Sequence, residues 1–245
     1  MKLRRTIFSI ALSVLILSCG IFGSLAEGTE PAAEPAVTDN GSQLAAFFKT
    51  LDNEAGFHIR YELEIMGYNS IYDDQAKGDF FFERNYIEQI GSSDSDTLKV
   101  YRDGKMYSMK KSDMSGIYMD VPEIEDFHYY GAMFCTIYQN VMTRVLEPVY
   151  ETIEYTVGET TFKAEKYPAQ SEYGVDQIFC FDEAGSLAYM INCANESIGL
   201  GEYIYKIDVI DDAVDESLFD ITGYTFTDYQ TALAEAQAAL EQLAG

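Results

Sequence analysis

Apolar and polar side chains alternate over short stretches through most of the chain beyond residue 56. The segment 57–65 is the clearest example, because Phe57, Ile59, Tyr61, Leu63 and Ile65 fall on one side and its charged residues on the other. A period of two is typical of an antiparallel strand with one buried face. The same pattern predicts further strands at 76–85, 86–91, 97–102, 105–110, 149–159, 160–168 and 202–211, and a hairpin at 177–192.

A two-residue turn, Asp103-Gly104, connects two of these strands. A type I′ turn needs positive φ at both positions, and this dipeptide supplies it. Pairing across the turn sets the register and places the apolar residues of both strands on one face. A second turn at 112–116 is expected to add a third strand to that face. The residues assigned to it are Leu98, Val100, Tyr107, Met109, Ile117 and Met119.

Helical spacing of apolar residues occurs in three places. It predicts a short helix at 43–51, an inserted helix at 131–146 that ends before Pro148, and a C-terminal helix with its stripe from Tyr229 to Leu243. The order of elements predicts a mainly β, α+β fold. A single curved antiparallel sheet is expected to form an incomplete β-barrel, covered by the inserted lid helix and by terminal helices.

The first 18 residues have the pattern of a signal peptide. Lys2, Arg4 and Arg5 precede an apolar run at 7–17. That run is too short to span a hydrocarbon layer of about 30 Å, which needs about 20 residues. Export from the cytoplasm is therefore expected.

Cys19 follows Ile16-Leu17-Ser18, a sequence similar to a bacterial lipobox. It is predicted to be the lipidated N-terminus of a protein anchored to the extracytoplasmic side of a membrane. Residues 19–42 would then form an acidic flexible tether, and 43–245 the folded domain. The alternative is cleavage after the small-residue site at 24–26, which would give a secreted soluble protein.

The formal net charge is −25. Because the signal peptide contributes three basic residues and no acid, the remainder of the chain is more acidic still. Such a surface repels phosphate backbones, so nucleic acid is excluded as a partner. The hydrophobic fraction of 47% is sufficient for a full core.

No group of residues in the sequence suggests covalent chemistry, a metal or a cofactor. His58 lies on the polar side of its strand, where a solvated side chain is expected, and no nucleophile elbow or zinc spacing occurs. The acidic pairs at 94–96 and 211–212 lack the glycine-containing loop of a calcium site. Cys135, Cys180 and Cys193 are expected to be free thiols. The protein is therefore expected not to be an enzyme.

The collinear pieces resemble the bacterial lipoprotein-carrier family of LolA, with its LolB and LppX relatives. The matching positions are Gly78, Phe80, Phe82, Arg84, Asp103, Gly104 and Lys105. Asn85 stands where that family often has proline, and the chain has no tryptophan. The resemblance implies a half-barrel at 43–245 whose cavity takes acyl chains, and it implies that Arg84 latches the lid helices.

Two functions remain open from the sequence. The first is a membrane-anchored lipoprotein that binds a lipid or acylated ligand in an apolar concave cavity. The second is a cell-envelope interaction lipoprotein with a closed core, no ligand and a protein partner. For the first, the expected cavity residues are Ile59, Tyr61, Leu63, Phe80, Phe82, Val100, Tyr107, Met109 and Met119.

Overall fold

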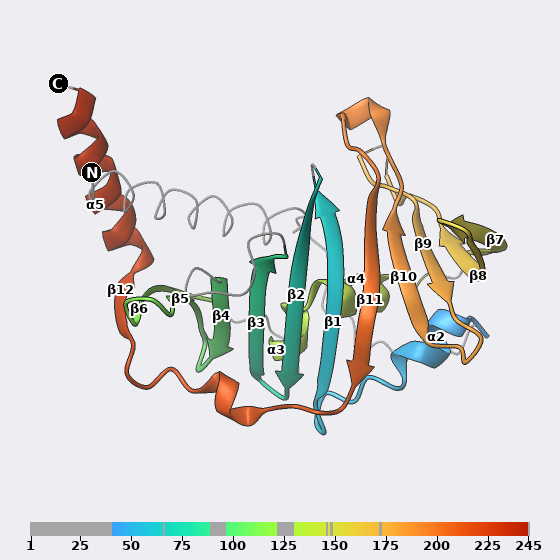
Figure 1. The fold of residues 1–245 in the computed structure, drawn as a ribbon, viewed down its shortest axis with the longest axis horizontal. Helices are drawn as coiled ribbons and strands as arrows, with labels where there is room; N and C mark the ends of the chain where they lie inside the picture. The colour runs from blue at the N-terminus through green and yellow to red at the C-terminus, as the bar shows by residue number, and fades with distance from the viewer. Residues whose placement is uncertain are drawn as a thin grey trace, which may run out of the picture.

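A computed structural model describes residues 41–65, 67–88, 97–121, 130–145, 147, 149–171 and 173–244. The predicted signal peptide, Cys19, nearly all of the tether and the acidic residues 94–96 lie outside this part. Within it, twelve strands form one sheet in the order β12-β6-β5-β4-β3-β2-β1-β11-β10-β9-β8-β7. Neighbouring strands are antiparallel except β12 and β6, which are parallel. The sheet is curved and does not close (Figure 1), which confirms the predicted fold class.

Most neighbouring strands are also consecutive in the chain, and the exceptions are β1 with β11 and β12 with β6. The strands are β1 (Phe57–Ile65), β2 (Tyr68–Lys77), β3 (Phe80–Ile87), β4 (Thr97–Arg102), β5 (Lys105–Lys110), β6 (Ser115–Asp120), β7 (Glu151–Val157), β8 (Thr160–Tyr167), β9 (Gln177–Phe181), β10 (Leu187–Asn192), β11 (Tyr203–Asp211) and β12 (Thr225–Asp228). The helices are α2 (Gln43–Phe48), α3 (Tyr130–Met133), α4 (Thr136–Val145) and α5 (Tyr229–Ala244), with 3-10 turns η1 (Glu196–Ile198) and η2 (Glu216–Phe219).

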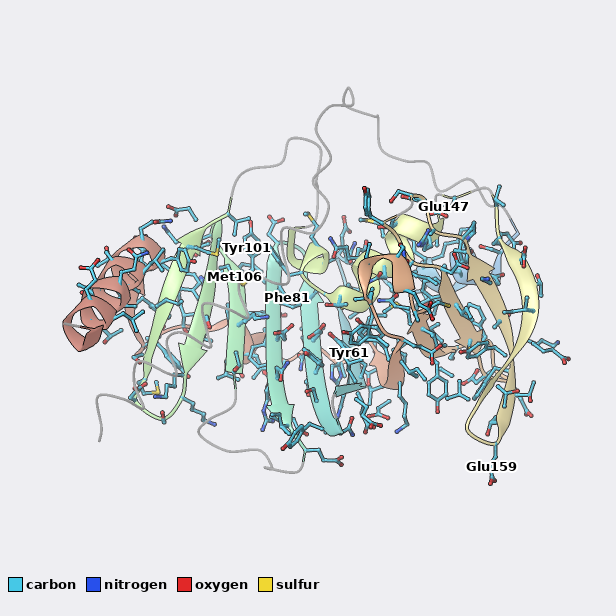
Figure 2. The ribbon with its side chains drawn as sticks, turned by 90° about the horizontal axis from the view of Figure 1, so that it is seen from above. Tyr61, Phe81, Tyr101, Met106, Glu147 and Glu159 are labelled. Atoms are coloured by element: carbon cyan, nitrogen blue, oxygen red, sulfur yellow. The ribbon has the colours of Figure 1, made fainter. Side chains whose placement is uncertain are left out.

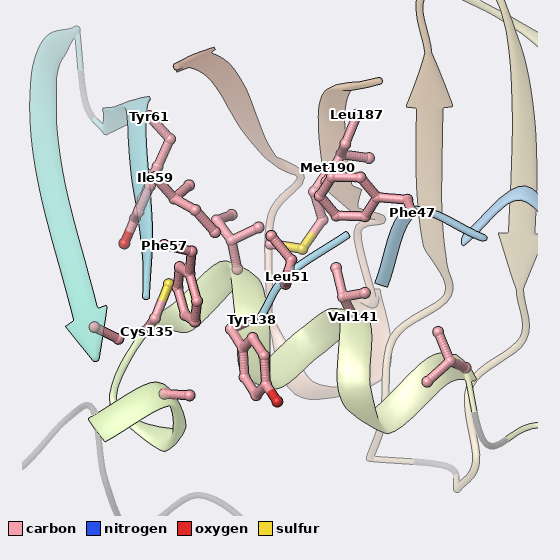
Figure 3. Packing of buried hydrophobic residues seen from close by; sticks show 14 of the residues in the cluster. Phe47, Leu51, Phe57, Ile59, Tyr61, Cys135, Tyr138, Val141, Leu187 and Met190 are labelled. Atoms are coloured by element: carbon pink, nitrogen blue, oxygen red, sulfur yellow. The ribbon is translucent and has the colours of Figure 1, made fainter. Parts of the chain in front are cut away.

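One face of the sheet, here called the helix face, packs against α2, α3 and α4. Figure 3 shows Phe57 of β1 beside Tyr138 of α4, and Phe47 of α2 beside Met190 of β10. The Phe57 and Tyr138 rings stack at 5.2 Å. Toward β5 the same face carries Tyr61 of β1, Phe81 of β3, Tyr101 of β4 and Met106 of β5 (Figure 2). These side chains belong to the largest hydrophobic cluster of the protein.

The opposite face, here called the back face, is covered at one end by the chain between β11 and β12. This segment runs along one end of the strands (Figure 1) and contributes residues from Val214 to Tyr224 to a second cluster, which also includes Phe226 of β12. The buried sheet residues of that cluster are Phe82, Val100 and Met109. The sheet is thus apolar on both faces in β3, β4 and β5.

The back face at the other end is enclosed by the curl of the sheet itself. Ala164, Ile178, Cys180 and Ile191 are buried there without any of α2 to α5 in their cluster. The Tyr155 hydroxyl of β7 donates a hydrogen bond to Glu202, next to β11, at 3.4 Å. Three strands separate β7 from β11 in the sheet order, so this contact requires strong curvature.

The hairpin register is confirmed in full. Asp103 and Gly104 have φ of 52° and 73°, and Val100 pairs with Tyr107 and Leu98 with Met109. The next strand was placed wrongly, because Met119 pairs with Met106 and Ile117 with Ser108, on the helix face. Strand β2 was not predicted, and residues 80–87 form one strand where two were expected.

Candidate functional site

The residues predicted to line one cavity are divided between the two faces. Ile59, Tyr61 and Leu63 are buried on the helix face, and Met119 packs against the same cluster. Phe82, Val100 and Met109 are buried on the back face against Phe219, with Tyr107 packed beside them. The single concave face proposed from the sequence is therefore wrong.

Phe80 lies apart from both groups at the end of the sheet. Its ring is 37% exposed and stacks on Phe219 at 5.8 Å. The Arg102 guanidinium lies 5.7 Å from the Phe80 ring centroid and donates a hydrogen bond to the Phe219 carbonyl at 3.2 Å. Phe80 thus helps to attach η2 to the rim of the sheet.

The predicted cavity residues lie on two faces because of the register in which β2 pairs with β1 and β3. Ile59 pairs with Asp74, and Asp74 pairs with Glu83 of β3. Directly paired residues share a face, so Glu83 and Phe81 lie on the helix face. Phe82, one position away, must lie on the back face because side chains alternate along a strand.

The space between the sheet and the helices is filled by the protein's own side chains. Tyr61, Phe57 and Ile59 are at most 2% exposed under α4, and α4 contributes Ile137 and Val141 with no exposed area. The Tyr61 and Tyr72 rings stack at 4.8 Å on the same face. This part of the helix face is a packed core like that of an ordinary domain.

A buried arginine attaches α4, but it is Arg144 and not Arg84. Arg144 donates from Nε to Gln177 Oε1 at 2.5 Å, and from its terminal nitrogens to the carbonyls of Pro168 at 3.0 Å and Val175 at 3.1 Å. It also pairs with Glu147 at 2.7 Å. Arg84 pairs across the sheet with Leu98 on the back face, with its guanidinium over the Tyr86 ring. The predicted latch residue therefore faces away from the lid.

Helix α2 is held by a carboxylate from the sheet. Glu165 of β8 accepts hydrogen bonds from the backbone amides of Gln43 at 2.6 Å and Leu44 at 3.1 Å. Ser42 accepts a further one from Ala45. These three amides are among the donors that a helix cannot satisfy internally at its N-terminus. Glu165 thus positions α2 against β10.

A pair of acidic side chains lies inside the helix-face core. Asp74 is fully buried and directly opposite Glu83, whose Oε1 lies 2.6 Å from Lys99 Nζ. Burial, followed by the charge of Glu83, raises the pKa of Asp74 well above its usual range. Burial likewise raises the pKa of the neighbouring Cys135 thiol. Both groups are enclosed, and burial favours the neutral form of each.

His58 is bound by two carboxylates on the back face, where a solvated side chain was expected. Its Nε2 lies 3.1 Å from Asp73 and its Nδ1 3.2 Å from Asp211, which joins β2, β1 and β11. The Asp73 hydrogen bond raises the pKa of His58. Although burial opposes it, the interaction with His58 lowers the pKa of Asp73. Among the described residues, no cluster of His, Cys, Asp and Glu side chains is suited to a metal ion.

The described residues form two large open grooves outside the packed core. The first, here called the rim groove, has a volume of about 720 Å³ and lies between η2 and the turns that follow β2 and β4. Phe80 and Phe219 form part of its apolar lining, and Lys77 pairs with Glu216 across it. Its charged lining residues are Glu54, Lys77, Asp79, Arg102, Asp103, Glu216 and Asp220.

The second groove, here called the α2 groove, has a volume of about 670 Å³. It is bounded by α2, by the turn between β9 and β10, and by the last part of β11. Phe47, Leu187 and Ile207 give it apolar walls, and Asp182 and Asp208 are its charged residues. No pattern in the sequence indicated either groove.

The part of the chain that the structure describes contains no helix long and apolar enough to cross a membrane. A scan against protein-family models finds no match, and no curated protein matches the sequence.

Solved structures give distant similarities. An uncharacterized conserved protein from Thermus thermophilus aligns with a TM-score of 0.46 and 5% identity, over 77% of this chain and 98% of that one. MucB, which is also solved as the Pseudomonas aeruginosa MucA/MucB complex, aligns with a TM-score of 0.38 and 10% identity, over 73% of this chain and 61% of MucB. A DUF1329 family protein from Desulfovibrio piger aligns with a TM-score of 0.32 and 9% identity, over 74% and 96%. These similarities carry no functional assignment for this chain.

Proposed function

We propose that this protein is a membrane-anchored extracytoplasmic binding protein that binds a protein partner on the outer surface of a half-barrel whose interior is filled by its own side chains. One observation carries the proposal: Phe57, Ile59 and Tyr61 fill the helix face together with residues of α4. A ligand inside that space would have to displace a packed core. Binding at the surface requires no such rearrangement.

The lipid anchor is proposed because of Cys19 and the sequence before it. A lipid on Cys19 would attach the domain to the membrane through residues 20–42, for which the composition predicts a flexible coil with an r.m.s. reach of about 25 Å. That distance exceeds the Debye length of about 8 Å at physiological salt. The acidic domain would therefore remain clear of repulsion from anionic lipids.

The groups whose pKa values are shifted lie at positions that agree with a non-catalytic role. Asp74 and Cys135 are enclosed in the core, and His58 is held between two carboxylates that link strands. We infer that these groups serve structure and not substrate chemistry.

The lipid-binding alternative is favoured by one feature, the α2 groove. An acyl chain could lie against Phe47, Leu187 and Ile207 there without entering the packed core. It would be a surface site, unlike the cavity expected from the sequence. Apolar lining with few polar groups is the usual form of such a site.

A titration with a fluorescent fatty acid tests the proposal. The purified protein should show no saturable increase in probe fluorescence. Saturable binding that is lost in Ala46→Trp, a substitution at an exposed residue lining the α2 groove, would replace the proposal with acyl binding. Ala234→Trp on the exposed side of α5 is the matched control.

A further inference from the structure

The sheet splits between β10 and β11 beside the α2 groove. The two strands pair from Asn192–Tyr203 to Tyr189–Lys206, and β11 then continues to Asp211 with β1 as its partner. The register of β10 shifts at Ala188 and that of β11 at Asp208. Bulges of this kind bend a strand and increase its twist. Figure 1 shows β10 diverging from β11 toward the end where α2 lies.

The split leaves part of the β11 backbone facing the groove. Among the described residues, no strand pairs with 207–210 on the side away from β1. Asp208 is an exposed residue although its side chain is only 22% exposed, so its backbone contributes much of the exposed area. A row of backbone donors and acceptors without a partner strand is a template for another extended chain.

We propose that the α2 groove receives an extended peptide segment of a partner protein, which pairs with β11 at 207–210. Apolar side chains on one side of the segment would contact Phe47, Leu187 and Ile207. Main-chain hydrogen bonds supply affinity in this mode of recognition, and alternate side chains supply selectivity. The inference rests on the proposed function and names the partner's chemistry.

Charge decides which extended chain fits. The groove lining contains Asp182 and Asp208 and no lysine or arginine. Lys206 beside it neutralises part of this charge, at 2.9 Å from Asp208. A second copy of this chain has a net charge of −25, and the tether 20–42 contains acids and no base. Both would be repelled, so the segment is a basic one from another protein.

Fluorescence anisotropy at about 150 mM salt tests the inference with a labelled Lys-Val-Thr-Val-Lys-Val-Thr peptide. The protein should bind it. A peptide with alternate amides N-methylated keeps the charge but cannot pair along one edge, and it should bind about tenfold more weakly or worse. Ala46→Trp should cause a similar loss by filling the groove, and Ala234→Trp should have no effect.

Three results would overturn the inference: no binding of the unmodified peptide, equal affinity for the methylated peptide, or equal affinity in Ala46→Trp. A melting curve like that of the parent protein shows that Ala46→Trp is folded. Failure here leaves the filled core of the half-barrel unaffected, because native mass spectrometry tests separately whether a lipid is held inside it. Saturable fatty-acid binding would end the proposed function whatever the peptide does.

Discussion

At the level of single residues, ionisable side chains on the two faces of the sheet are stabilised in different ways. On the helix face Asp74 is enclosed opposite Glu83, and burial raises the pKa of its carboxyl group. On the back face His58 is only partly buried, and Asp73 and Asp211 favour its charged form. Burial thus favours the neutral form of Asp74, whereas the carboxylates beside His58 favour its cation.

His58 gives the fold a predictable pH dependence. A pKa raised above 6.5 in the folded state means that protonated His58 favours folding. This stabilisation is complete below the unfolded pKa and is lost as pH rises through the folded pKa. The difference in unfolding free energy between the protein and His58→Gln should therefore be largest below about pH 6.5 and shrink as the pH rises above it. Urea unfolding at a series of pH values measures it, and a constant difference would contradict the assignment.

Gly104 is required by the backbone of its turn and not by crowding. Its φ is 73°, and no atom lies within 4 Å of where a Cβ would stand. Gly104→Val should therefore cost about 1–2 kcal/mol, the penalty for a side chain in the left-handed region. The control is Gly201→Val, at an exposed glycine that has no positive φ and equally open space. Equal melting temperatures for the two variants would disprove the turn type.

At the level of elements, the position of α4 depends on a polar attachment and not on apolar packing alone. Arg144 reaches three groups of the segment 168–177, which leads into β9. Glu165 of β8 holds the beginning of α2 in a comparable way. Both helices are thus attached to the β8–β9 part of the sheet. Their positions therefore depend on these side-chain hydrogen bonds as well as on apolar packing.

Arg144→Ala should destabilise the protein by about 2–4 kcal/mol, because it leaves the buried Gln177 side chain and two carbonyls without their donor. Arg84→Ala, on the back face, should cost less than about 1 kcal/mol. Chemical denaturation compares the two variants directly. If Arg84→Ala were the more damaging, the attachment would lie where the resemblance placed it.

Some elements could be predicted from the residues within them, and others could not. The Asp103-Gly104 hairpin could be predicted with its register, because the turn residues alone determine it. Strand β2 could not, because Asp73 and Asp74 occupy both of its faces and break the alternation. Without β2, the faces of β1 and β3 could not be aligned. The apolar stripe predicted for the C-terminal helix was also only partly right, since its residue Leu240 is 54% exposed.

At the level of the whole molecule, the curved sheet was predictable and the candidate site was not. Alternation in many short strands is enough to predict such a sheet. The α2 groove instead depends on the bulges at Ala188 and Asp208, which separate β10 from β11. Neither residue type signals a bulge in the sequence. The Arg144 attachment likewise joins partners more than twenty positions apart.

The anchor makes a prediction for the protein in its cell. Cys19→Ser should move the protein from the membrane fraction to the soluble fraction, because the lipid on Cys19 would be what anchors the protein to the bilayer. Immunoblotting of the two fractions measures this, and Cys193→Ser is the control at a half-buried thiol of the domain. A variant that stays with the membrane, or a mature N-terminus at Glu27, would contradict the lipidation of Cys19.

The central claim is that the half-barrel is filled by its own side chains. Native mass spectrometry of the protein purified from its own membrane tests this most directly, because a lipid held inside would be carried with it. A half-barrel filled by its own side chains predicts a single species with the mass of the polypeptide, apart from any lipid covalently attached at the N-terminus. A stoichiometric adduct with the mass of a fatty acid or phospholipid, retained through gentle activation, would contradict it.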